Sequence, residues 1–159
     1  MTFKVGDRVV YPHHGAAIIE KTEMVELNDE KKKYFVLKTA HDELTVRVPV
    51  DKAEEVGMRP PISLEDVEDL FVLLAKKDVR EPANWSRRFK NHQEKLKSGD
   101  VYQVAEVVRN LALRESAKGL SAGEKNMYSK ARKVLVSELS FSLDVSEDDA
   151  LEQVEVHLG

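Results

Sequence analysis

The segment GMRPPIS (Gly57–Ser63) separates two parts of the chain that differ in the spacing of their apolar residues. Before it, apolar and polar residues alternate with a period of two, which is typical of half-buried β-strands. After it, apolar residues recur every three to four positions, as on one face of an α-helix. The paired prolines Pro60 and Pro61 disfavour helical conformation in the residues before them. We therefore predict an α+β protein, with one domain at residues 1–60 and an all-α domain at residues 63–159.

The first domain contains four alternating stretches that predict β-strands. They are FKVGDRVVY (3–11), GAAIIEKTEMVEL (15–27), KYFVLKTA (33–40) and ELTVRVPV (43–50). Turn signals lie within or between them at Gly6–Asp7, Pro12–Gly15, Asn28–Asp29 and His41–Asp42. No connection is long enough for a helical crossover, so the strands are expected to pair antiparallel. The pattern predicts a small antiparallel β-barrel.

The second domain is marked by helix boundary signals. The expected N-cap residues are Ser63, Asn84, Asp100 and Ser121, and a short acidic final helix is expected from about Ser146. Glu124 follows Ser121 by three positions, which predicts a reciprocal capping box. Glycines at 99 and 119 predict the ends of two of these helices.

Most catalytic and metal-binding motifs are missing from the sequence. The 159 residues include no cysteine, no Gly-rich phosphate loop and no Gly-x-Ser-x-Gly elbow. His13 and His14 are adjacent, and neighbouring side chains on a strand point to opposite faces, which suits chelation of one ion poorly. A metal-dependent hydrolase that uses this pair is therefore a remote alternative. We expect no enzymatic activity, no cofactor, no metal and no small-molecule substrate.

The first residues are too polar for a signal peptide, and no run of 18 apolar residues occurs. We expect a cytoplasmic protein with no membrane partner, and a monomer. The net charge of −4 is unevenly distributed, because residues 76–133 carry 15 Lys or Arg against 7 Asp or Glu, whereas residues 134–159 carry only acidic charge. A basic segment of this kind is typical of a nucleic-acid contact, although a solvated helical surface is also compatible with it.

The only tryptophan of the chain lies in the basic segment, in NWSRRFK (84–90). Trp85 begins a helical stripe with spacings of four, three and four, which by itself favours a core position. The other members of this stripe are Phe89, His92 and Leu96. However, Trp85 lies in the first helical turn, and Arg87, Arg88 and Lys90 surround it in sequence. Cations that bind phosphates beside a flat apolar ring are what a wedge between DNA bases requires.

The sequence resembles the CarD family of bacterial transcription regulators over essentially its whole length. The segments that carry the resemblance are Phe3–Ala17, Leu44–Val50, Asn84–Lys90, Ser98–Leu111 and Gly119–Arg132. The resemblance implies a Tudor-like barrel that binds the β-subunit lobe of RNA polymerase, as in transcription-repair coupling factor. It also implies a helical domain that contacts promoter DNA. The segment after about Ser142 shows no clear resemblance.

The family's DNA-contacting positions fall on residues of the basic segment. Trp85 is the implied wedge, which enters the minor groove at the upstream edge of the melted promoter. Arg87 and Lys90 are implied phosphate contacts, and Lys125 and Lys130 are weaker candidates. The expected function is stabilisation of the open promoter complex without catalysis. The alternative is a protein-interaction adaptor that does not bind DNA and has Trp85 in its helical core.

The family's polymerase-facing strand falls on LTVRVPV (44–50), where Arg47 is the implied basic contact. The candidate polymerase-binding residues are Thr45, Val46, Arg47 and Val25. A second arginine of the family is replaced here by Val25. Either the polymerase is held less tightly, or Lys21 or the lysines at 31–33 compensate.

Overall fold

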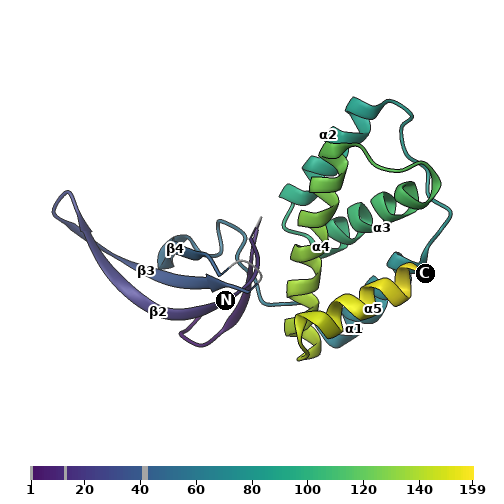
Figure 1. Cartoon of the computed structure of the whole chain (residues 1–159). Coiled ribbons are helices and arrows are strands. Elements are labelled where there is room, and N and C mark those ends of the chain that lie inside the picture. The colour runs from purple at the N-terminus through teal and green to yellow at the C-terminus, as the bar shows by residue number, and fades with distance from the viewer. Residues whose placement is uncertain (1, 13, 41–42) are drawn as a thin grey trace.

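A computed structural model describes residues 2–12, 14–40 and 43–159. In this part of the chain, an N-terminal β-sheet is followed by a region of five α-helices (Figure 1). The strands are β1 (Arg8–Tyr11), β2 (Gly15–Leu27), β3 (Glu30–Thr39) and β4 (Thr45–Pro49), and a short 3-10 helix follows at Val50–Lys52. The helices are α1 (Leu64–Ala75), α2 (Trp85–Lys97), α3 (Val101–Ala117), α4 (Ala122–Leu143) and α5 (Glu147–Leu158). The predicted α+β class is confirmed.

The four strands form one antiparallel sheet in the order β1-β2-β3-β4. Asn28 and Asp29 have φ values of 52° and 65°, the positive pair that a type I′ hairpin turn needs, and they join β2 to β3. The sheet curls into a half-barrel, which fits a Tudor-like fold, and β4 pairs only with β3 among the described strands. The predicted turn at His41–Asp42 lies outside the described residues.

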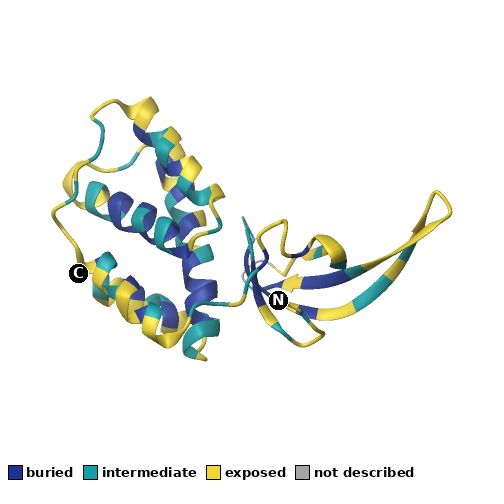
Figure 2. Cartoon of the chain, turned by 180° about the vertical axis from the view of Figure 1, so that it is seen from behind, coloured by how far each residue is buried: buried dark blue, intermediate teal, exposed yellow. Residues whose placement is uncertain are grey.

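The sheet and the helices have separate apolar cores. The core of the sheet is formed by alternating residues, among them Val9, Ile19, Leu37 and Val48. The helical core is centred on α3 and α4, where Figure 2 shows the buried positions concentrated. The acidic C-terminal segment is part of this core, because α5 buries Ala150 and Val154 against it.

The first four helices begin after the N-cap residues that the sequence predicts, and α5 begins after Ser146, near the expected start of the final helix. The side chains of Ser63, Asn84, Asp100, Ser121 and Ser146 each accept a hydrogen bond from a backbone N–H of the first turn. Ser121 and Glu124 close the predicted capping box reciprocally. The helix α4 is 22 residues long and lies between the sheet and the other helices, with α2 beside its beginning and α1 and α5 near its end (Figure 1).

Candidate nucleic-acid and polymerase interfaces

Trp85 is the first residue of α2, and 44% of it is exposed. Its ring stacks on Phe89 with centroids 4.8 Å apart and an interplanar angle of 17°. Phe89 is itself half-buried against the helical core, and Gly123 leaves room for it, because a Cβ there would lie 3.4 Å from the Phe89 ring. One face of the indole is therefore supported while much of the side chain is in solvent. This differs from the core position that the helical period favours, because the first turn projects past the end of the helical packing.

A buried carboxylate lies behind Trp85. Glu124, in the first turn of α4, is only 2% exposed and accepts hydrogen bonds from the Ser121 backbone N–H at 3.2 Å and hydroxyl at 3.0 Å. It also pairs with Arg88 at 3.7 Å and Arg114 at 3.6 Å. The Trp85 side chain also lies close enough to the same carboxylate to lower its pKa. Glu124 thus connects the start of α4 to the start of α2.

The surroundings of Glu124 stabilise its ionised form. Burial by itself raises the pKa of this carboxyl, but hydrogen bonds from Ser121 and Trp85 and the charge of Arg88 outweigh it, so the pKa lies below 4.5. A second pair joins α2 to the segment before it, where Nε2 of the buried His92 is 2.6 Å from Glu81 Oε2. The pKa of Glu81 is also lowered, because contact with His92 more than offsets the effect of burial.

Arg88 occupies a different place from the other predicted cations. Its place in sequence between Arg87 and Lys90 predicts a further DNA contact, but in the structure it is 2% exposed. Its Nη1 donates to the carbonyls of Pro82 and Ala83 at 3.3 and 3.4 Å, and its charge faces Glu124. A phosphate outside the protein cannot reach a guanidinium enclosed in this way. Arg88 is the internal counter-charge of Glu124, and we leave it out of the DNA-contacting set.

The remaining predicted cations are exposed. Arg87 and Lys90 are exposed residues of α2, and their spacing of three places them on one face. They lie about 200° and 140° around the helix from Trp85, so they lie on the side of α2 largely opposite the ring. Lys125 is exposed on α4, directly after Glu124, and Lys130 is exposed further along the same helix. Exposed cations therefore lie on both α2 and α4, the two helices whose first turns meet at Glu124.

The strand β4 offers an open edge. Thr39 N–H donates to Leu44 O at 2.9 Å, and hydrogen-bonded pairs alternate along an antiparallel ladder. The backbone groups of Thr45 and Arg47 therefore point away from β3, toward the free edge. The Arg47 side chain is exposed on the outer face of the sheet, where its Nε lies 3.4 Å from Glu23 Oε2.

The other two residues of the predicted polymerase interface are placed differently. Val46 packs its side chain against the core of the sheet, so only its backbone is part of the edge strand. Val25 lies on β2 opposite Lys32, and by alternation it shares the outer face with Glu23. Val25 and Arg47 thus belong to one face of the sheet, with Glu23 next to Arg47.

Within the described residues, no three His, Asp or Glu side chains are grouped closely enough to hold a metal ion. His13 of the predicted His13–His14 pair lies outside these residues. The helices of the described chain are also too short or too polar to span a bilayer.

Known proteins show the same two-part organisation. Residues 3–62 match the CarD-like/TRCF RID domain, an RNA polymerase-interacting domain, and residues 69–155 match the CarD C-terminal domain. The chain belongs to the CarD family. A relative, the putative transcription factor YdeB of Bacillus subtilis (strain 168), is 33% identical over 145 residues, which cover 91% of this chain and 95% of the relative. The family is one of transcription regulators, and the described sheet is its polymerase-interacting part.

Sequence reasoning alone missed several residues of this CarD-family structure. The capping box identified Glu124 as a helix cap, but its spacing gave no indication of the contacts with Arg88 and Trp85. Glu138, a buried acid on α4, was also missed. The signal available for it was the polar pair Ser137–Glu138 within the otherwise apolar run of 134–139.

Proposed function

We propose that this CarD-family protein docks on the β subunit of RNA polymerase and stabilises the open promoter complex by inserting Trp85 at the upstream edge of the bubble. The observation that carries this proposal is the half-exposed Trp85 ring, supported on Phe89 beside exposed cations. A supported aromatic face is suited to stacking on a base at an opened step. The mechanism requires no catalysis, and it places the protein in the bacterial cytoplasm, at the nucleoid.

The cations around the ring would hold the DNA backbone. Arg87 and Lys90 would contact phosphates on one side of Trp85, and Lys125 would approach from α4. The N-terminus of α2 adds a partial positive charge at the same place. These contacts would position the ring without reading base sequence, because phosphates carry no sequence information directly.

The open edge of β4 would bind the polymerase. Thr45 and Arg47 offer unpaired backbone groups to an added strand, which is a common mode of peptide recognition. Arg47 would exchange its exposed contact with Glu23 for a carboxylate of the polymerase. Such a tether raises the effective concentration of Trp85 at the fork, so weak DNA affinity is sufficient.

The expected gain follows from stacking energies. One stacked base contributes about 1–3 kcal/mol. This corresponds to an increase of about five- to 150-fold in the ratio of open to closed complex.

The proposal can be tested by the lifetime of open complexes after a competitor challenge, with purified polymerase and a promoter fragment. Trp85→Ala is expected to remain bound to polymerase in a pull-down but to lose the lifetime extension. Arg47→Glu is expected to lose both. Val72→Ala is the matched control, because Val72 is an apolar residue of α1 that is 73% exposed. A wild-type lifetime with Trp85→Ala would refute the wedge, and no DNA protection at the fork in a footprint would favour the adaptor alternative.

A further inference from the structure

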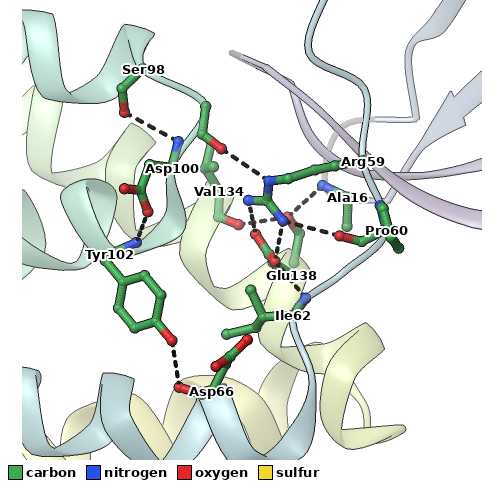
Figure 3. Close-up of polar contacts among 12 residues, drawn as sticks. Ala16, Arg59, Pro60, Ile62, Asp66, Ser98, Asp100, Tyr102, Val134 and Glu138 are labelled. Carbon is green, nitrogen blue, oxygen red and sulfur yellow. Dashed lines mark hydrogen bonds and ion pairs between the residues drawn. The ribbon is translucent and has the colours of Figure 1, made fainter. Parts of the chain in front are cut away.

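Arg59 belongs to both parts of the structure. Its backbone pairs with β1, since Arg59 N–H donates to Val10 O at 3.1 Å and Val10 N–H donates to Arg59 O at 2.6 Å. Its side chain reaches the helical region, where Nη1 and Nη2 donate to the two oxygens of Glu138 at 2.7 and 2.8 Å (Figure 3). The Nε donates to Gly99 O, before α3, at 3.1 Å. One residue therefore joins the edge of the sheet to α4 and α3.

Glu138 is buried at this junction, with 1% exposure. Besides the bidentate pair with Arg59, its Oε2 accepts the backbone N–H of Ile62 at 2.9 Å. A buried carboxylate is costly unless its charge and lone pairs are matched. The orientation in which Arg59 and Ile62 both donate to Glu138 is therefore strongly preferred. Rotation of the sheet relative to the helices would break these hydrogen bonds and leave the buried carboxylate unpaired.

A second buried contact restrains the same junction. The backbone N–H of Ala16, at the start of β2, donates to Ser137 Oγ on α4 at 3.1 Å. The preceding Gly15 has φ +76°, and a Cβ there would lie 2.7 Å from Ser137 Oγ. The β1–β2 turn and α4 are thus in direct contact. Three points, at Arg59, Ile62 and Ala16, define one orientation between sheet and helices.

The helix α4 connects this junction to Trp85. Glu138 lies 14 residues after Glu124, which corresponds to about 21 Å of rigid helix. At the beginning of α4, Glu124 pairs with Arg88 and Gly123 packs against Phe89, on which the Trp85 ring stacks. On the other side of the junction, the sheet continues through β2 and β3 to β4. The direction of α4 relative to the sheet therefore determines where Trp85 lies relative to Arg47.

We propose that Glu138 is a positioning residue, which by clamping Arg59 holds Trp85 at a fixed place relative to the docking strand β4. This inference rests on the proposed function. With the clamp intact, docking of β4 delivers the ring to one point, and the effective concentration of Trp85 at the fork is high. Without the clamp, the same two binding surfaces persist but the ring samples many positions. Polymerase affinity and DNA affinity then stay unchanged while open-complex stabilisation is lost.

The clamp itself can be tested without polymerase or DNA. The chain contains no cysteine, so spin labels can be placed uniquely through Lys38→Cys on β3 and Glu94→Cys on α2, two exposed positions. We expect one narrow distance distribution in this parent protein and a broad one after Glu138→Gln, which keeps the side-chain shape but removes the charge. The control is Asp144→Asn, which weakens an exposed ion pair with Arg8 across the same junction, at 3.3 Å, and should leave the distribution narrow. A narrow distribution with Glu138→Gln would overturn the clamp.

The positioning role is tested with unlabelled variants in the open-complex lifetime assay. Glu138→Gln should retain wild-type polymerase pull-down and wild-type affinity for fork DNA, yet lose most of the about five- to 150-fold stabilisation. If Glu138→Gln unfolds, Arg59→Lys serves instead, because lysine cannot span both carboxylate oxygens and Gly99 O. A full lifetime extension together with a broad distance distribution would overturn the positioning role. If the wild-type protein itself does not extend the lifetime, the proposed function fails, and the distance measurement still decides whether Glu138 orients the two regions.

Discussion

Replacing Glu124 by glutamine should weaken the helical region and release Trp85. The substitution keeps the length of the side chain and its ability to close the capping box with Ser121, but it removes the negative charge between Arg88 and Arg114. The loss of this charge affects Arg88 most, because Arg88 is 2% exposed. Its Nε and Nη2 make no hydrogen bond within the described structure. Glu124→Gln therefore removes the ion-pair partner of this buried guanidinium.

The size of the effect follows from this geometry. Removing one partner of a buried ion pair typically costs about 3–5 kcal/mol. Carbonyl contacts from Pro82 and Ala83 still solvate part of the Arg88 charge, so we expect the lower end, a loss of about 3 kcal/mol in the free energy of unfolding. A domain with about 5–15 kcal/mol of stability remains folded after this loss.

The assay is urea unfolding monitored by helical circular dichroism, with the fluorescence of Trp85 as a second probe. Because Trp85 is the only tryptophan, its emission reports this site alone, and a shift to the red is expected as the released ring becomes more exposed to water. Asn126→Gln, at an exposed position in the same turn, is the control and should change stability by less than about 0.5 kcal/mol. Adding Arg88→Met to Glu124→Gln should recover part of the loss. A loss below about 1 kcal/mol, or no recovery in the double variant, would refute the counter-charge role.

Three further predictions concern pH, salt and the junction between sheet and helices. The pKa of Glu124 is lower in the folded protein than its usual 4.5, so its stabilising contribution is complete above that value and is lost as the pH falls through the folded pKa. The free energy of unfolding should therefore fall less steeply with acidification in Glu124→Gln than in the wild type. Identical curves for the two proteins would contradict this. Neutralising Arg87 and Lys90 together should reduce the slope of log affinity against log salt for duplex DNA by about 0.9 per lost phosphate contact. The reduction should be similar for DNA fragments of unrelated sequence. Equal slopes for wild type and variant would mean that these side chains do not touch phosphate. Gly15→Ala should lower the melting temperature more than Gly119→Ala. Both glycines have positive φ, but only the alanine methyl at position 15 would meet a side chain of α4. Equal melting temperatures would show that α4 moves to accommodate the methyl group without cost.

The elements of this protein were determined by local sequence. The alternation before Gly57 and the helical period after Ser63 predicted the α+β class, and the four predicted N-caps were found at their residues. These signals were readable because a strand, a turn or a cap depends on residues within about four positions of one another. The sequence also indicated the half-exposed tryptophan, through its place in a first turn next to cations.

The tertiary structure alone decided which charges lie inside. In sequence, Arg87 and Arg88 are equivalent neighbours, yet packing against α4 exposes the first and buries the second against Glu124. The orientation between sheet and helices was equally hidden, because Arg59 and Glu138 are 79 residues apart. A separation of 79 residues matches no helical or strand repeat, and arginine and glutamate are both common surface residues. The sequence therefore gives no signal that the two side chains meet. Such a pair is recognised only once the chain has brought a buried acid and the end of a strand together, since desolvation, which gives the contact its strength, is a property of the packed structure.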